Sequence, residues 1–83
     1  MKVQLRYFAS VREAVGRGGE QHETRAATLR QLRDELAGQG APYAEALAPG
    51  RAVRMALDQV MVQDDAPLRD GCEVAFFPPV TGG

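Results

Sequence analysis

The chain has 83 residues, of which 45% are hydrophobic and 25% are charged, and its formal net charge is −1. These values are typical of one small globular domain. A charge so close to zero argues against a basic surface for nucleic acid or for an anionic membrane. No apolar run is long enough to span a membrane, and the first residues lack the apolar segment of a signal peptide. Because the only cysteine, Cys72, cannot form an internal disulfide, we expect a cytoplasmic protein whose stability rests on packing.

The first part of the chain predicts two strands with a short helix between them. Apolar and polar residues alternate over residues 2–8, which predicts a strand with three residues facing the core: Val3, Leu5 and Tyr7. Ser10 and Glu13 have the spacing of a capping box with Ser10 at the N-cap, so a short helix is expected to follow Ser10 and to stop at Gly16. The polar residues 20–25 have weak strand character and suit the edge of a sheet.

The main helix is predicted to begin at a second capping box, formed by Thr28 and Gln31. Leucines recur at helical spacing after this box, and three of them share one face: Leu29, Leu32 and Leu36. Two glycines, Gly38 and Gly40, are expected to end the helix. Pro42 can open a further short helix that buries two residues, Tyr43 and Leu47.

The last third of the chain predicts three strands. Residues 52–62 alternate again, with a tight turn at Asp58-Gln59 and with five residues facing the core: Val53, Met55, Leu57, Val60 and Val62. Asp70-Gly71 is a turn signal, and residues 72–77 form the last strand, in which two residues point inward, Val74 and Phe76.

The order of these elements predicts an α+β domain of the β-grasp, or ubiquitin-like, class, with a mixed sheet of about five strands and one main helix packed across it. The first and last strands are expected to pair in parallel at the centre, because the chain between them is long enough for a crossover. We therefore expect a β-grasp domain over residues 1–77 and a flexible C-terminal tail over residues 78–83.

Alternation places three bulky apolar residues on the sheet face that the helix does not cover: Phe8, Met61 and Phe77. Singly exposed apolar residues are common on protein surfaces, and loops could cover Phe8 and Phe77 at the strand ends. A cluster of aromatic and methionine side chains on so small a domain is, however, typical of a docking surface. We favour a partner-docking patch beside the exit of the tail.

Residues of the kind that carry catalysis are few and scattered. His22, the only histidine, is expected to be a solvated residue of the edge strand. Cys72 follows a turn and is expected to be a half-buried, inert thiol, since no histidine or lysine adjoins it in sequence. Asp64 and Asp65 suit a solvated turn better than a metal site. The sequence therefore predicts no metal site and no free-standing active site, and it directs attention to the terminal Gly83.

The C-terminal tail has the composition of an arm that enters a narrow slot: Pro78-Pro79-Val80-Thr81-Gly82-Gly83. The prolines fix φ and favour an extended start, so that little freedom is lost on insertion. Val80 and Thr81 are stiff and uncharged, and the two glycines fit where no side chain can. Extended, residues 78–83 span about 20 Å. The carboxylate of Gly83 is sterically open, so another enzyme could activate it.

The end of the chain also resembles a known family. Residues 70–83, Asp-Gly-Cys-Glu-Val-Ala-Phe-Phe-Pro-Pro-Val-Thr-Gly-Gly, resemble the terminal signature of the small subunit of molybdopterin synthase, the MoaD family of sulfur carriers. The likeness covers essentially the whole chain, and further similar segments are Tyr7-Phe8-Ala9, Val11-Arg12-Glu13, the central helix and Pro67-Leu68. The sequence departs from the family at Cys72, where an acidic residue is common, and at Asp58, where asparagine is frequent. Neither departure touches the tail.

This resemblance implies a sulfur carrier that is not an enzyme by itself. A homologue of the ubiquitin-activating enzymes would use ATP to adenylate the carboxylate of Gly83, and a persulfide donor would convert the adenylate to a thiocarboxylate. The tail would then enter the synthase large subunit and give its sulfur to a cyclic pyranopterin phosphate, two transfers building the dithiolene of molybdopterin. The implied assembly is a heterotetramer whose catalytic residues lie on the large subunit, and no cofactor is bound to this chain.

Three alternatives share some of these features. A sulfur carrier for thiamine or cysteine synthesis would have the same fold and Gly-Gly end, but the Phe-Phe-Pro-Pro lead-in argues against it. A ubiquitin-like modifier would join Gly83 to lysines through an isopeptide bond. A pure binding module would need no reaction at Gly83 at all.

Overall fold

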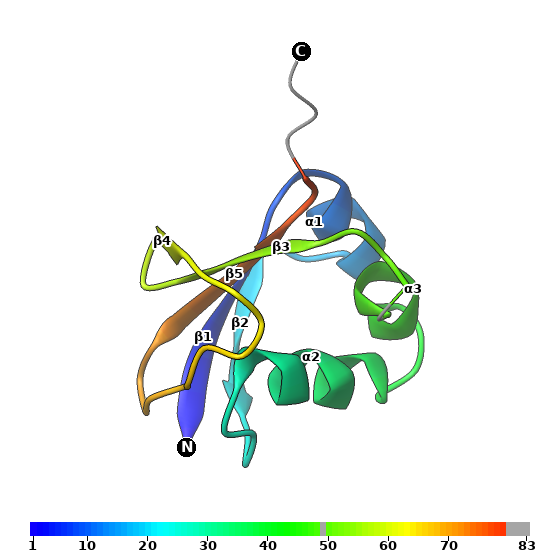
Figure 1. The fold of residues 1–83 in the computed structure, drawn as a ribbon. Helices are drawn as coiled ribbons and strands as arrows, with labels where there is room; N and C mark the ends of the chain where they lie inside the picture. The colour runs from blue at the N-terminus through cyan, green and yellow to red at the C-terminus, as the bar shows by residue number, and fades with distance from the viewer. Residues whose placement is uncertain (49, 80–83) are drawn as a thin grey trace.

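A mixed β-sheet with helices packed on one of its faces forms the molecule (Figure 1). The computed structural model describes residues 1–48 and 50–79. Along the chain the elements are β1 (Lys2–Tyr7), α1 (Ala9–Val15), β2 (Gly19–Glu23), α2 (Leu29–Ala37), α3 (Tyr43–Leu47), β3 (Arg54–Leu57), β4 (Val60–Met61) and β5 (Glu73–Phe77).

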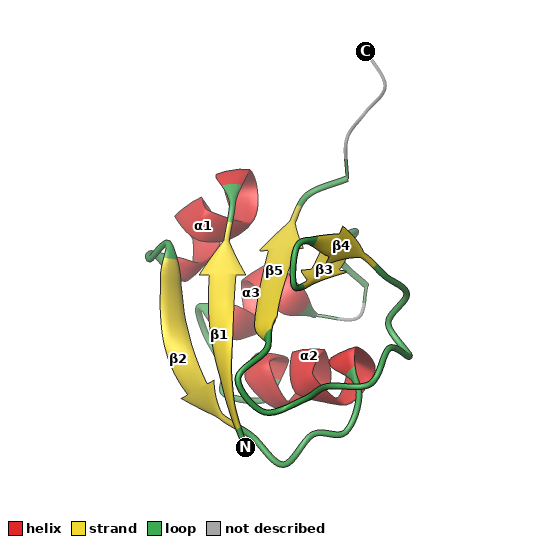
Figure 2. Cartoon of the chain, turned by 90° about the vertical axis from the view of Figure 1, so that its left-hand side faces the viewer, coloured by secondary structure: helices red, strands yellow, loops and turns green. Residues whose placement is uncertain are grey.

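The strands of the sheet follow the order β2-β1-β5-β3-β4. β1 and β5 lie next to each other inside the sheet and run parallel, with Tyr7 opposite Phe76, whereas the other neighbouring strands are antiparallel. Figure 2 shows these two strands side by side with the helices behind them. The predicted β-grasp arrangement is confirmed, including the parallel pairing of the first and last strands and the position of β2 at an edge.

The inner face of the sheet and the helices enclose the core. Nine residues that the sequence predicted to face inward are at most 1% exposed: Val3, Leu5, Tyr7, Leu29, Leu32, Leu36, Leu47, Val74 and Phe76. Met55 is 6% exposed, whereas Val53, Leu57 and Val62 are only partly buried against this core. The rings of Tyr7 and Phe76 stack across the central pair of strands with their centroids 6.0 Å apart. Because burying one leucine-sized side chain contributes about 1.5–3 kcal/mol, this set is the main source of stability in so small a domain.

Helix α1 begins two residues earlier than predicted, and the predicted capping box at Ser10 is wrong. The residue before the helix is Phe8, whose backbone is extended and whose side chain makes no capping bond. The amide of Phe8 donates to the carbonyl of Phe76 in β5 at 3.1 Å, so the sheet fixes where the helix starts and Ser10 falls inside the first turn. The predicted end at Gly16 is confirmed by its φ of 90°, which glycine adopts without strain.

Helix α2 begins as predicted, directly after the N-cap residue Thr28, whose hydroxyl accepts from the amide of Gln31 at 3.3 Å. The side chain of Gln31 accepts in return from the amide of Ala27 at 2.7 Å, one residue before the position that a capping box requires. Helix α3 follows Pro42, also as predicted, with Leu47 buried and Tyr43 partly buried against the core.

The hairpin between β3 and β4 turns where the sequence predicted, at Asp58 and Gln59. Both residues have positive φ, 49° and 69°, as a two-residue type I′ turn requires. Val60, however, was predicted to face the core and is 63% exposed. It lies opposite Leu57 in a two-residue edge strand, beyond the part of the sheet that the helices cover (Figure 1). The alternation assigns Val60 to the correct face of the strand, but the helix layer does not extend far enough to bury it.

Candidate functional site

The uncovered face of the sheet carries the residues predicted to dock a partner. Strand register puts Met61 opposite Ala56, and Ala56 opposite Ala75, so these side chains form a row across β4, β3 and β5. Phe77 lies two residues beyond Ala75 and so points to the same face, as does Phe8 after β1. The outer patch is defined here as these five residues: Phe8, Ala56, Met61, Ala75 and Phe77. Its two alanines, Ala56 and Ala75, are only 6% and 7% exposed and form the floor between the larger side chains.

Phe8 and Phe77 pack against each other at the end of the sheet where β5 gives way to the tail. Their ring centroids are 6.4 Å apart and their planes meet at 80°, an edge-to-face pair. The guanidinium of Arg6 lies 5.9 Å from the centroid of the Phe8 ring, a cation–π contact. Phe8 is 44% exposed and Met61 is 51% exposed. The structure thus brings Phe8 and Phe77 into contact and sets Met61 on the same face, two strands away from Phe77.

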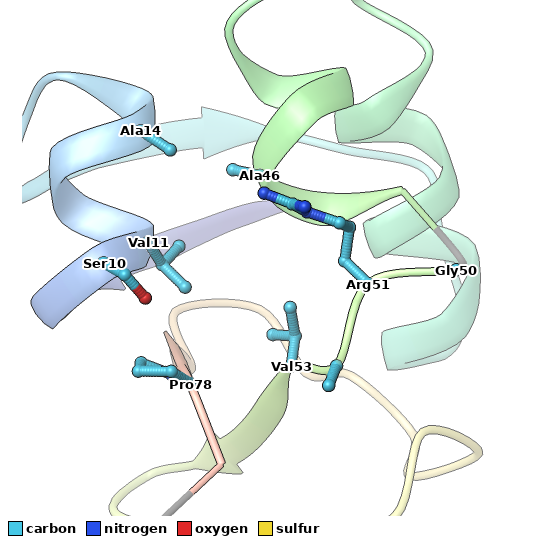
Figure 3. A pocket seen from close by; sticks show the side chains of 9 residues that line it. Ser10, Val11, Ala14, Ala46, Gly50, Arg51, Val53 and Pro78 are labelled. Carbon is cyan, nitrogen blue, oxygen red and sulfur yellow. The ribbon is translucent and has the colours of Figure 1, made fainter.

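A groove of about 310 Å³ lies at the root of the tail, on the helix side of the sheet (Figure 3). Pro78 forms one wall, Ser10 and Val11 of α1 form another, and Arg51 and Val53 lie across from them. Because Pro78 is half-buried among these residues, its packing fixes the direction in which the chain leaves the sheet.

Arg33 of helix α2 holds one wall of this groove in place. Its guanidinium donates to the carbonyls of Leu47, Ala48 and Arg51 at 2.8, 2.8 and 2.6 Å. Burial lowers the pKa of Arg33 from its ordinary value, although arginine stays protonated at any physiological pH. One side chain therefore caps the end of α3 and fixes the turn that faces Pro78. The sequence predicted only that this arginine points away from the core, since no motif signals a contact with distant backbone atoms.

The tail is described only at its root. β5 ends at Phe77, as the two prolines predicted, and Pro79 is exposed. Four tail residues lie outside the described residues: Val80, Thr81, Gly82 and Gly83. Their roles stay predictions from the sequence.

His22 is less solvated than predicted. Its side chain is 19% exposed, and its Nε2 lies 2.6 Å from a carboxylate oxygen of Glu35 in α2. The other oxygen of Glu35 accepts from the hydroxyl of the buried Thr24 at 3.1 Å. These contacts tie the edge strand to the main helix. Because His22 pairs with Val3 near the start of β1, it stands at the opposite end of the sheet from the tail.

The other titratable candidates are also structural. Cys72 is a free thiol and is only 4% exposed, which is deeper than predicted. Asp64 accepts hydrogen bonds from Arg30 at 3.0 and 3.1 Å, and this guanidinium lowers the pKa of the Asp64 carboxyl. Within residues 1–48 and 50–79, no group of three or more His, Cys, Asp or Glu side chains could hold a metal ion. No helix in the same ranges is long and apolar enough to cross a membrane.

A polar network around Glu20 was not predicted from the sequence. The hydroxyls of Tyr7 and Tyr43 both donate to one oxygen of this carboxylate, at 2.9 and 2.7 Å, and Arg17 donates to the other at 3.2 Å. Burial first, and then the bond to Glu20, raises the pKa of Tyr7, and the bond to Glu20 raises the pKa of Tyr43. Both tyrosines are therefore neutral donors that join β1 and α3 to β2. Alternation could assign Tyr7 to the core, but it could not show what its hydroxyl meets.

The chain is similar to proteins of known class over nearly its whole length. The ThiS family matches residues 5–83. The molybdopterin synthase sulfur carrier subunit of Escherichia coli (strain K12) is 43% identical over 81 residues, covering 98% of this chain and 99% of that protein. The subunit of the same name from Haemophilus influenzae is 39% identical over 77 residues, with coverages of 93% and 94%. A solved protein–protein complex of subunits 1 and 2 of molybdopterin-converting factor from Helicobacter pylori 26695 contains a chain that superposes with a TM-score of 0.69 at 26% identity, covering 100% of both chains.

The fold, the outer patch and the Gly-Gly signature define a β-grasp carrier protein. The chain belongs to the ThiS family. Within that family it stands with the molybdopterin synthase sulfur carrier subunits of molybdopterin biosynthesis, which are carriers rather than catalytic subunits. The function implied by the resemblance of residues 70–83 is thereby confirmed at the level of the subunit and its pathway.

Proposed function

We propose that the carboxylate of Gly83 is the group on which this chain carries sulfur. The observation that carries the proposal is the root of the tail, where β5 ends at Phe77 and Pro78 is held between α1 and the segment before β3. This packing sets the direction in which Pro78 and Pro79 leave the sheet, beside the outer patch. A carrier whose last residues must enter another protein needs this combination of a fixed root and a slender end.

The proposed chemistry has two steps at the same carbon. An oxygen of the Gly83 carboxylate attacks the α-phosphorus of ATP on an activating enzyme, and pyrophosphate leaves. A persulfide sulfur then attacks the carbonyl carbon, the C–O bond to AMP breaks, and an acyl disulfide remains. A thiol of the sulfur donor cleaves the S–S bond, which leaves the thiocarboxylate on Gly83 and a disulfide on the donor. AMP is a good leaving group, which is why the activation precedes the attack by sulfur.

The proposed partners follow from the outer patch. The Helicobacter pylori structure is a complex of subunits 1 and 2 of molybdopterin-converting factor, and one of its chains superposes on this chain over the full length of both. We propose that Phe8, Met61 and Phe77 dock the synthase large subunit in a heterotetramer, while residues 78–83 insert. An edge-to-face phenylalanine pair with exposed faces is the kind of anchor that dominates binding energy in such interfaces.

ATP enters this scheme only as a substrate of the activating enzyme, and no cofactor is proposed for this chain. The cytoplasm is the proposed compartment, since the buried free thiol of Cys72 is compatible with reducing conditions. The same compartment would hold the persulfide donor and the large subunit.

Deletion of Gly83 tests the proposal. The full chain and the variant are each incubated with an activating enzyme, ATP and a persulfide donor, and their intact masses are measured. The full chain is expected to gain the mass difference between sulfur and oxygen, and the variant is expected to remain unchanged. Val60→Ala is the matched control, because Val60 is exposed and lies outside the patch and the tail. Thiocarboxylate formation by the deletion variant at the rate of the full chain would refute the role of Gly83.

A further inference from the structure

The cationic side chains around the root of the tail are arginines. Arg54 lies directly opposite Phe77 in the β3–β5 ladder, Arg51 lines the groove with Pro78, and Arg6 lies over the ring of Phe8. All three arginines are exposed. They come from three different segments of the chain. Arg54 shares the outer face of the sheet with Phe77, as does Arg6, which also lies 3.8 Å from a carboxylate oxygen of Glu73, whereas Arg51 lines the groove on the helix side (Figure 3).

The primary amines of this chain lie at the other end of the molecule. Lys2 is the only lysine in the sequence, which has nine arginines. The amide of Gly71 donates to the carbonyl of Lys2 at 2.7 Å, so Lys2 stands level with the start of β5, whereas the tail follows its end. The α-amino group of Met1 donates to the carbonyl of Thr24 at 2.9 Å, at that same end. Figure 2 shows the N-terminus at the foot of the sheet and the tip of β5 at the top.

Lys2 is much farther from the root of the tail than Arg54 and Arg51 are. Residues Lys2–Tyr7 form one strand that runs parallel to β5, with Tyr7 opposite Phe76, so at about 3.3 Å per residue Lys2 lies about 17 Å behind the level of Phe76. The four residues beyond Pro79 extend by at most about 14 Å. The carboxyl of Gly83 therefore reaches the positions of Arg54 and Arg51 readily, whereas only a fully extended tail folded straight back along the sheet approaches the amine of Lys2.

The difference between the two cations matters because an activated carboxyl group reacts with amines. A lysine amine with an ordinary pKa near 10.4 is neutral in about one molecule in a thousand at pH 7.4. Holding it beside the reacting carbon compensates for that small fraction, because effective molarities in such intramolecular reactions reach about 10⁵ M or more. A guanidinium keeps its proton and its delocalised charge at this pH, so it supplies the same positive charge without a nucleophilic lone pair.

We infer that the arginines at the tail exit, Arg6, Arg51 and Arg54, determine the specificity of the activated C-terminus: they give the exit positive charge without placing an amine beside the reacting carbonyl. The carboxyl group is thereby left for sulfur instead of closing onto its own domain as an amide. This inference rests on the proposed activation of Gly83. It predicts that lysine is tolerated at exposed positions far from the exit and is harmful close to it.

The experiment uses a C-terminal thioester of the full chain, made by intein cleavage with a small thiol. The thioester stands in for the activated carboxyl and requires no activating enzyme. In the internal reaction the lysine nitrogen attacks the carbonyl carbon, a C–N bond forms, the C–S bond breaks, and the thiol leaves with the proton of the amine. The amide is lighter than the hydrolysed acid by one water, so intact mass distinguishes the two products. Arg54→Lys is the test variant, and Arg69→Lys is the matched control, because Arg69 is exposed and precedes β5 at the end where Lys2 lies.

The wild-type thioester and the Arg69→Lys thioester are expected to hydrolyse to the acid with no internal amide. The Arg54→Lys thioester is expected to convert largely to the amide, with the new bond located between Gly83 and position 54 by peptide mapping. Amide formation in the wild type, or equal amounts in both lysine variants, overturns the inference. So does an Arg54→Lys thioester that only hydrolyses. Because no activating enzyme takes part, these outcomes are independent of the Gly83 deletion experiment, which alone decides whether Gly83 is activated.

Discussion

Truncation of Phe8 to alanine is expected to weaken binding of the synthase large subunit about 30-fold while the free chain stays folded. Phe8 is 44% exposed, and its contacts are the ring of Phe77 on one side and the guanidinium of Arg6 on the other. Its backbone amide and carbonyl keep their bonds in the variant, because alanine adopts the same extended conformation at φ −127° and ψ 151°. The substitution therefore tests the side chain alone.

The magnitudes follow from these contacts. An edge-to-face aromatic pair is worth about 0.5–1.5 kcal/mol beyond area burial, and an exposed cation–π contact about 0.5–1 kcal/mol. The free energy of unfolding is therefore expected to fall by about 1–2.5 kcal/mol. An aromatic anchor at the centre of an interface costs about 2 kcal/mol or more when it is truncated. That loss corresponds to a Kd for the large subunit about 30-fold weaker.

The assay is isothermal titration of the large subunit with each variant, accompanied by urea denaturation of the free chain. Val60→Ala is the control, because Val60 is 63% exposed but lies on the other face of the sheet, opposite Leu57. Its Kd is expected to match that of the wild type within about twofold. The reasoning is refuted if Phe8→Ala binds as tightly as the wild type, or if the Val60 variant loses as much affinity. A loss of stability well above about 3 kcal/mol would mean that Phe8 supports the core.

Two further predictions concern the groove and the loop before Leu68. Arg33→Met is expected to lower the free energy of unfolding by about 2–3 kcal/mol, because three carbonyls lose a charged donor and water replaces it only in part. Urea denaturation measures this loss, Arg33→Lys is expected to restore only part of it, and a methionine variant as stable as the wild type would contradict the assigned contacts. Arg30 depresses the pKa of the Asp64 carboxyl, so the stability from this pair is present above the ordinary carboxyl pKa near 4 and is lost as the pH falls through the lower folded value. In Arg30→Gln, NMR titration is expected to return the pKa of Asp64 to its ordinary range, and an unchanged pKa would exclude Arg30 as the cause.

The strand and helix patterns could be predicted because each depends on residues close in sequence. Val3, Leu5 and Tyr7 alternate within one strand, and the positive φ values at Asp58 and Gln59 belong to a two-residue turn. The faces of the sheet follow from the same alternation, which is why three members of the outer patch, Phe8, Met61 and Phe77, could be placed on that face from the sequence.

The features that the sequence did not predict depend on where other elements end. Whether Val60 is buried depends on the extent of the helix layer, and the start of α1 depends on the bond from Phe8 to β5. Arg33 binds backbone carbonyls of a distant segment, and Glu20 gathers the hydroxyls of Tyr7 and Tyr43. Such polar contacts join side chains to positions that only the folded chain brings together, and no local periodicity marks them.

The position of β5 has a mechanical consequence. This strand is hydrogen-bonded to β1 on one side and to β3 on the other, and the tail continues directly from its end. A partner that draws the tail into a pocket pulls along the axis of β5, so the force acts in shear on the hydrogen bonds to both neighbouring strands at once. Hydrogen bonds sheared in this way share the force, whereas those of a strand peeled from the edge of a sheet break one after another. The sheet thus anchors the tail along the whole length of β5, and the domain can be held by its last residues without unfolding.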